Sequence, residues 1–293
     1  MKAVFIGSVE FSFRSLEKLI AMGVDLVGVC AKKSSAYNSD FFDLKPLCNK
    51  NKIPCFYTED INSITTVQWI KNLNPDIIFC FGWSSIIKKD ILALAPMGTI
   101  GYHPAKLPKN RGRHPLIWSL ALGLKESAST FFFMDRYADN GDILSQVNFE
   151  IDYQDDARSL YEKVVKLALI QIEEFIPAIE KGIHKKIKQK KKLSNYWRKR
   201  NELDGEIDFR MNSRSIYNLT RALTKPYIGS HIRFNKKKYS VWKVKESNNF
   251  QENIEPGRVL SVHGKVFVVK TYDGAIEIID HDFREIPKVG ECL

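Results

Sequence analysis

The first 180 residues alternate short apolar runs with stretches of helical periodicity, and no other feature of the chain limits its fold as strongly. Runs of this length suit buried strands, because a helix needs a longer stretch to bury one face. We expect strands at Ala3–Gly7, Leu26–Cys30, Ile53–Tyr57, Asp76–Gly82, Thr99–His103, Thr130–Asp135 and Ile143–Ile151. Helices are expected at Phe13–Met22, Thr65–Leu73, Lys88–Leu94, His114–Leu122 and Asp156–Gly182. Such alternation predicts an α/β domain with a Rossmann-like, doubly wound, mostly parallel sheet.

A different pattern begins at about Gly205. One helical period, Ser213–Leu223, is followed by alternating runs at Lys238–Lys245, Arg258–Val262 and Lys265–Tyr272. Short strands joined by tight turns predict a smaller β-rich domain, an open barrel resembling an OB fold. The expected organisation is therefore an α/β domain over residues 1–183, a basic linker over 184–204 and a barrel-like domain over 205–293. Residues 33–42 are polar and irregular, and we expect a mobile loop there.

The net charge of +11 is concentrated in one segment. Residues 181–200 contain ten Lys or Arg residues and no acidic residue. A basic run of this kind can attract phosphate groups through Coulomb steering and counterion release. It can equally be a solvated linker, and composition alone leaves both interpretations open.

Several classes of protein are disfavoured by the remaining motifs. The five cysteines include no Cys-x-x-Cys pair, which argues against a disulfide framework and a thiolate zinc site, so no metal is expected. The segment after Gly7 lacks the further glycines of a dinucleotide fingerprint. The start of the chain has the pattern of a buried strand and not of a signal peptide, and no apolar stretch approaches the roughly 20 residues that span a bilayer. We expect a cytoplasmic protein with no membrane partner.

The stretch from Gly98 to Asp142 carries the most chemistry. His103 ends an expected strand and precedes Pro104, which directs the chain out of the sheet. In α/β domains ligands bind at the carboxyl ends of strands. The next expected strand leads into Asp139, which can reach His103 if the two strands are neighbours. A His–carboxylate pair in a cleft can act as a general base near neutral pH, although the spacing fits equally a turn carboxylate beside a satisfied histidine.

This stretch also resembles a known family, the 10-formyltetrahydrofolate-dependent formyltransferases. Their signature is an Asn-x-His, a Pro-x-Leu-Leu-Pro loop and an Asp-x-Gly after the next strand. Here His103, Ala105-Lys106-Leu107-Pro108 and Asp139-Asn140-Gly141 match these elements, and the likeness extends over essentially the whole chain. One position departs from the signature: the family's asparagine falls at Gly101.

The resemblance implies an enzyme that transfers a formyl group from its co-substrate, 10-formyltetrahydrofolate, to a primary amine. In this reading His103 manages protons and Asp139 orients the imidazole, while the family's asparagine stabilises an oxyanion. Losing one oxyanion donor costs about 10²–10³ in rate. Gly101 therefore implies that another donor serves, with a backbone N–H, Asn110 or Asn140 as candidates, or that the chain is a catalytically impaired folate- or nucleic-acid-binding homologue.

The resemblance also implies binding residues. The folate would contact Ser84, Ile86, Ile87, Asp135 and Asp139. Ile86 and Ile87 are equally compatible with plain core packing. The acceptor would contact Tyr102, Pro104, Lys106, Lys109, Asn110, Arg111 and Arg113. The two arginines suit a diphosphate because a guanidinium can bind it through two parallel hydrogen bonds, but they can also be merely solvated.

Two acceptors fit within the family. The segments at 111–118 and 196–200 resemble sugar N-formyltransferases, which indicates a nucleotide-linked amino sugar, such as a 4-amino-4,6-dideoxy sugar of cell-surface polysaccharide biosynthesis. Trp118 and Trp197 in these segments are as compatible with packing as with stacking on a ligand. Methionyl-tRNA is the alternative, because a basic run and a small barrel suit an RNA stem. Exposed strand edges in the second domain are compatible with a homodimer.

Overall fold

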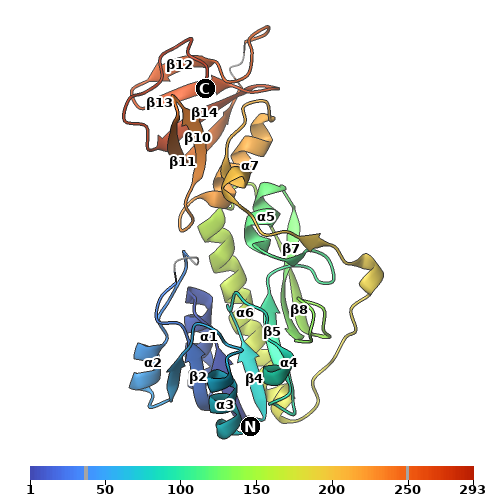
Figure 1. Ribbon diagram of the computed structural model, residues 1–293. Coiled ribbons are helices and arrows are strands. Elements are labelled where there is room, and N and C mark those ends of the chain that lie inside the picture. Colours follow the sequence, from blue (N-terminus) through green and yellow to red (C-terminus); the bar gives the residue numbers. More distant parts are fainter. Residues whose placement is uncertain (36–38, 249–250) are drawn as a thin grey trace. The chain divides into compact units, whose positions relative to one another are not determined.

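The computed structural model describes residues 1–35, 39–248 and 251–293, and these form two compact units (Figure 1). The first unit comprises residues 1–115, 127–149 and 162–197, and the second comprises 116–126, 150–161 and 198–293. Part of the loop expected at 33–42 lies outside the described residues. In the described parts of the chain, no helix combines the length and the apolar character that crossing a membrane requires.

The first unit is built on a seven-stranded sheet with the order β3-β2-β1-β4-β5-β7-β8. Its strands are β1 (Lys2–Ile6), β2 (Asp25–Ala31), β3 (Cys55–Tyr57), β4 (Ile77–Cys80), β5 (Thr99–His103), β7 (Glu126–Phe133) and β8 (Ile143–Glu150). The pairs from β3 to β5 are parallel, whereas β5 and β7 are antiparallel. The expectation of a Rossmann-like, mostly parallel sheet is confirmed.

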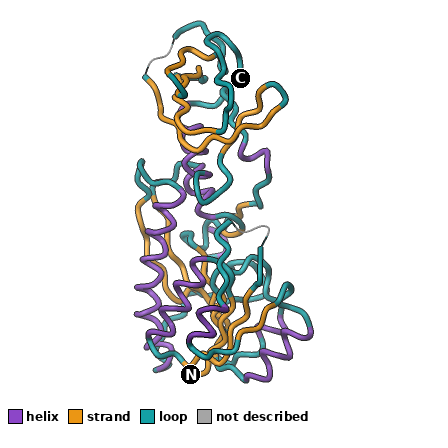
Figure 2. Tube along the Cα trace, turned by 90° about the vertical axis from the view of Figure 1, so that its left-hand side faces the viewer, coloured by secondary structure: helices purple, strands orange, loops and turns teal. Residues whose placement is uncertain are grey.

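Helices cover both faces of this sheet, as Figure 2 shows for the lower part of the molecule. They are α1 (Glu10–Ala21), α2 (Lys45–Lys50), α3 (Ile64–Leu73), α4 (Lys89–Leu92) and most of α6 (Ala157–Glu180), whereas α5 (Pro115–Ala121) lies almost wholly in the second unit. The central strands read as unbroken apolar runs because both of their faces are buried. On one face Val4 and Ile78 pack with Ile70 of α3. On the other, Phe131 lies 4.9 Å from Phe175 of α6, measured between ring centroids. The sequence did not predict α2.

The segment after α6 differs from the linker expected over 184–204. Ile187 and Ile143 exchange two backbone hydrogen bonds, of 2.8 and 2.9 Å. Further on, β9 (Tyr196–Trp197) pairs in parallel with β6 (Arg111–Gly112). We call residues 187–197 the strap. It belongs to the first unit, because its backbone is bonded to strands of that unit at both ends.

The second unit contains a five-stranded antiparallel sheet with the order β10-β11-β14-β13-β12. Its strands are β10 (Ser230–Phe234), β11 (Lys237–Ser247), β12 (Val259–His263), β13 (Val266–Lys270) and β14 (Ala275–His281). Helix α7 (Ser213–Leu223) packs on β11 and is capped by Asn212, whose Oδ1 accepts a 2.7 Å hydrogen bond from the amide of Ser215. Short 3₁₀ turns span Lys191–Leu193 and Glu202–Gly205. The predicted smaller β-rich domain is confirmed, with β10 and β14 as strands that the sequence did not predict.

Candidate active site

His103 is the last residue of β5, and both nitrogens of its ring face hydrogen-bond acceptors. Nε2 lies 2.7 Å from the backbone oxygen of Asn110, and Nδ1 lies 3.7 Å from Oδ2 of Asp139. A carbonyl oxygen only accepts, so Nε2 carries the proton in the first contact. The neutral ring then presents an unprotonated Nδ1 toward the carboxylate. A proton accepted at Nδ1 would sit beside a negative charge that stabilises the imidazolium.

Asp139 is held in place by a tight turn. It adopts a left-handed backbone conformation, with φ of 53°, and its Oδ2 accepts a 2.9 Å hydrogen bond from the amide of Gly112. Within the turn, the two carboxylate oxygens of Asp135 accept from the amide of Tyr137 at 2.8 Å and from Nδ2 of Asn140 at 2.6 Å. The predicted approach of Asp139 to His103 is confirmed, because the antiparallel pairing of β5 and β7 places the strand end and the turn at one edge of the sheet.

The loop after His103 is fixed to β7 and β8. Thr130 Oγ1 donates to the backbone oxygen of Ala105 at 2.7 Å, and Gln146 Nε2 donates to that of Leu107 at 3.1 Å. The predicted acceptor contacts Pro104, Lys106 and Lys109 lie on this loop. Pro104 and Lys106 are partly exposed and Lys109 is exposed, so all three are accessible on a loop that is otherwise anchored.

The two arginines predicted to bind the acceptor have different environments. Arg113 is exposed, and its Nη1 donates to the backbone oxygen of Ser84 at 2.5 Å. This contact joins the loop after β4, the predicted folate side, to the loop after β5, the predicted acceptor side. Arg111, in contrast, is only 1% exposed. Its guanidinium donates at 2.6–3.0 Å to three side chains, those of Asn140, Tyr196 and Gln189. Arg111 therefore ties the wall of the site together and does not face a ligand, contrary to the prediction.

Tyr102 is not brought into the site either. Successive side chains of a strand point to opposite faces, so Tyr102 lies on the sheet face opposite to His103. Its ring packs against Phe11 at 4.4 Å and Phe131 at 4.7 Å, and its hydroxyl lies 2.9 Å from Oγ of Ser129. Burial raises the pKa of this hydroxyl. Tyr102 therefore packs in the core instead of contacting the substrate, because alternate residues of β5 take opposite faces of the sheet.

The two isoleucines predicted to contact the folate separate in the same way. Ile86 is 64% exposed, whereas Ile87 is 1% exposed and belongs to a core cluster with Ile61 and Ile70. Ser84, two residues before Ile86, is also exposed. Only Ile86 therefore offers an apolar surface to a ligand, and Ile87 corresponds to the core alternative that the sequence left open.

Gly101 and Met134 are complementary in volume. A Cβ built on Gly101 would lie 2.8 Å from Cγ of Met134, closer than real Cβ atoms come, and 3.0 Å from Cζ of Phe132, which is tighter than most real contacts. A side chain at this position would displace Met134. The amide of Asn140 is engaged on both sides, by Arg111 and Asp135. The side-chain oxygen of Asn110, Oδ1, accepts from Nδ2 of Asn195 at 3.2 Å, whereas its side-chain nitrogen, Nδ2, has no hydrogen bond within the described residues.

The contacts of the strap were not predicted from the sequence. Its residues Gln189, Asn195 and Tyr196 bond to the loops that carry Asp139, Asn110 and Arg111. The sequence signal for these contacts is that uncharged polar residues, Gln189 and Asn195, interrupt a run of lysines. Among the described residues, no group of three or more His, Cys, Asp or Glu side chains could hold a metal ion.

Comparisons with known proteins agree with this architecture. The family model for formyl transferase matches residues 4–175, and that for the formyl transferase C-terminal domain matches residues 200–288. The bifunctional polymyxin resistance protein ArnA of Wigglesworthia glossinidia brevipalpis is 32% identical over 287 residues, which cover 97% of this chain and 43% of that protein.

Two solved structures share the fold. An N-formyltransferase from Helicobacter canadensis, in complex with folinic acid and dTDP-3-aminofucose, superposes with a TM-score of 0.74 at 22% identity, covering 95% of this chain and 98% of that one. HypX from Aquifex aeolicus gives a TM-score of 0.69 at 17% identity, covering 97% of this chain and 46% of that one. The chain thus spans less than half the length of ArnA and HypX. On the strength of the matched family models, the chain belongs to the formyl transferase family.

Proposed function

We propose that the chain is an N-formyltransferase that moves a formyl group from 10-formyltetrahydrofolate to the primary amine of a nucleotide-linked amino sugar, such as a 4-amino-4,6-dideoxy sugar. The observation that carries this proposal is the buried His103, with Nδ1 3.7 Å from the carboxylate of Asp139 at the carboxyl end of β5. A base in this position lies where α/β folds bind their ligands.

The reaction joins the amine nitrogen to the formyl carbon and breaks the bond between that carbon and the folate nitrogen. The amine loses one proton and the folate nitrogen gains one. Nδ1 of His103 can accept the first proton, and the same ring can return a proton to the leaving nitrogen, so a single group balances both steps. Positioned general acid–base catalysis of this kind contributes about 10²–10⁴ in rate. Asp139 stabilises the ring while it is charged.

The exposed residues around this pair suit the two substrates. Ile86 provides an apolar surface beside Ser84 for the ring system of the folate. Asp135 has both carboxylate oxygens hydrogen-bonded inside its own turn and therefore shapes the folate side. Arg113 and Lys109 are exposed on the acceptor side and suit a diphosphate. That the Helicobacter canadensis structure holds dTDP-3-aminofucose supports a nucleotide sugar as the acceptor class.

Methionyl-tRNA is a second candidate acceptor. The observation in its favour is the row of exposed lysines in and beside the strap, among them Lys188, Lys190 and Lys191. Such a row could bind the phosphates of an RNA stem through charge.

A mass assay distinguishes these candidates. The purified protein is incubated with 10-formyltetrahydrofolate and, in separate reactions, with a nucleotide-linked 4-amino-4,6-dideoxy sugar or with methionyl-tRNA. We expect a formyl group on the sugar only, and none in a His103→Ala control. Modification of the tRNA alone would overturn the sugar proposal. Folate binding without transfer to either acceptor would instead identify a catalytically impaired homologue.

A further inference from the structure

Both partners of the His103 ring have an unusual backbone conformation. Asn110, whose oxygen accepts from Nε2, has φ of 62°, and Asp139, whose carboxylate faces Nδ1, has φ of 53°. Residues with a Cβ seldom adopt this left-handed region unless the surroundings enforce it. The orientation of the imidazole therefore depends on the groups that hold these two residues. The amide of Gly112 bonds to the Asp139 carboxylate, and in both cases the strap supplies further contacts.

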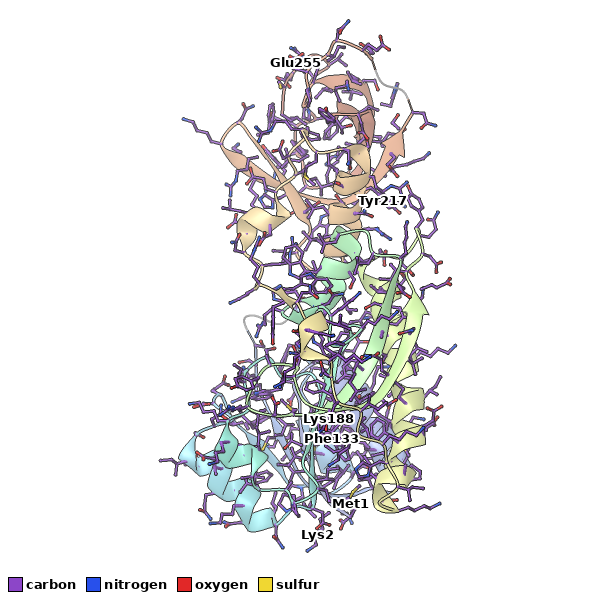
Figure 3. The ribbon with its side chains drawn as sticks, turned by 90° about the vertical axis from the view of Figure 1, so that its right-hand side faces the viewer. Met1, Lys2, Phe133, Lys188, Tyr217 and Glu255 are labelled. Carbon is purple, nitrogen blue, oxygen red and sulfur yellow. The ribbon has the colours of Figure 1, made fainter. Side chains whose placement is uncertain are left out.

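Gln189 of the strap is hydrogen-bonded to the turn that carries Asp139. Its Nε2 donates to the backbone oxygens of Asp139, at 3.0 Å, and Gly141, at 2.7 Å. Its Oε1 accepts from Nη2 of the buried Arg111 at 2.6 Å. One side-chain amide thus spans both sides of the turn and fastens it to the neighbouring loop. Lys188, labelled in Figure 3, and Lys190 flank Gln189 and are exposed, whereas the Gln189 side chain is directed to the turn.

Asn195 is hydrogen-bonded to Asn110, the other partner of the His103 ring. Its Oδ1 accepts from the backbone amide of Asn110 at 2.8 Å, and its Nδ2 donates to the side-chain oxygen of Asn110 at 3.2 Å. The backbone oxygen of Asn195 also accepts from the amide of Arg111 at 3.1 Å. The strap ends in β9, which directly follows Asn195 and pairs with β6. The contact between Asn195 and Asn110 therefore lies beside a backbone pairing of the two segments.

We propose that Gln189 and Asn195 are positioning residues of the active site, Gln189 setting the place of the Asp139 carboxylate and Asn195 setting that of the Asn110 carbonyl, so that together they fix the tautomer and orientation of His103. The reaction they serve rests on the proposed function. The chemistry requires amides: a glutamate at 189 cannot donate to two carbonyls, and a lysine there cannot accept from Arg111.

The primary test compares Gln189→Ala, Gln189→Glu and Asn195→Ala with Leu193→Ala, a matched control in the same segment whose side chain is exposed and uncharged. Misplacement of a catalytic group by about 1 Å can cost 10²-fold in rate. We expect the three Gln189 and Asn195 variants to lose about 10–100-fold in kcat while KM changes less than about threefold, and the control to retain wild-type kinetics. Gln189→Glu keeps the size of the side chain and guards against a loss caused by misfolding alone.

A second readout does not depend on turnover. The ¹⁵N chemical shifts of the His103 ring, assigned by comparison with His103→Gln, report which nitrogen carries the proton. We expect an Nε2–H tautomer in the wild type and in Asn195→Asp, which keeps the acceptor for Asn110, and a mixture in Asn195→Ala. If the tautomer and the kinetics of the Gln189 and Asn195 variants match those of Leu193→Ala, the proposal is wrong. If the wild type transfers no formyl group, the ¹⁵N measurement alone decides about the strap.

Discussion

The side chain of Met134 fills the space in front of Gly101, with Cγ 2.8 Å and Sδ 3.1 Å from where a Cβ of residue 101 would stand. Introducing Gly101→Asn should therefore overpack this region and reduce the free energy of unfolding by about 1–3 kcal/mol. In a Met134→Ala background the same substitution should cost less, because the clashing atoms are gone. Denaturant unfolding of the two single variants and the double variant measures the coupling. Additive effects would mean that the two positions do not compete for space.

Replacing either member of the His103–Asp139 pair should nearly abolish transfer while the fold survives. Neither residue lies in the apolar core, and general acid–base catalysis contributes about 10²–10⁴. We expect His103→Ala and Asp139→Ala each to lower kcat by at least about 10²-fold, with far-UV circular dichroism unchanged. Near-normal turnover in either variant would remove that residue from the mechanism. Asp139→Asn, which keeps the size but not the charge, should fall between these variants and the wild type.

Gly141 is needed for the approach of the Asp139 turn to β7. A Cβ on Gly141 would lie 1.7 Å from the backbone oxygen of Phe133, and a backbone atom cannot move aside as a side chain can. Gly141→Ala should therefore displace the turn and lower kcat by about 10-fold or more. Gly205→Ala is the control, because a Cβ there would meet its nearest neighbours at 3.4 Å, an ordinary contact distance. Equal activity of the two variants would contradict the structure of the turn.

Asp204 should contribute to stability in a pH-dependent way. The Arg198 guanidinium, at 2.7 Å in one of its contacts, holds the pKa of the Asp204 carboxyl at about 2, against an ordinary value of 3.8. A pKa that is lower in the folded state gives stability that is present above the unfolded pKa and is lost as the pH falls toward the folded one. The difference in Tm between the wild type and Asp204→Asn should therefore be largest above about pH 4 and shrink toward pH 2. A difference that stays constant across this window would show that the ion pair is not its source.

The sequence predicted those features that depend on local pattern. Helix α7 was predicted with its observed bounds, since its apolar period lies within the segment and Pro226 follows shortly after it. The same holds for β5 and for the meeting of His103 with Asp139, which follow from a strand end, a turn motif and the pairing of neighbouring strands.

Features that depend on distant partners escaped prediction. Tyr102 and Ile87 were implied as site residues by the family resemblance, but their side chains are fixed in the core by partners from other parts of the chain. Strand β10 is short and mixed in polarity, and its extended form is fixed by pairing with β11. The segment that contains the strap was predicted as a basic linker, because Gln189 and Asn195 find their partners about 50 and 85 residues away along the chain.

The interleaving of the two units along the chain has a practical consequence for dissecting the protein. The chain passes from one unit to the other after residues 115, 126, 149, 161 and 197, and α6 contains one of these crossings. A truncation after residue 183, which composition alone would suggest as a domain end, discards both amides that brace the imidazole. The segment 181–200 contains ten lysines and arginines, so trypsin would be expected to cut it readily. We expect residues 187–197 to be protected in limited proteolysis, because cleavage there requires two backbone pairings to break first.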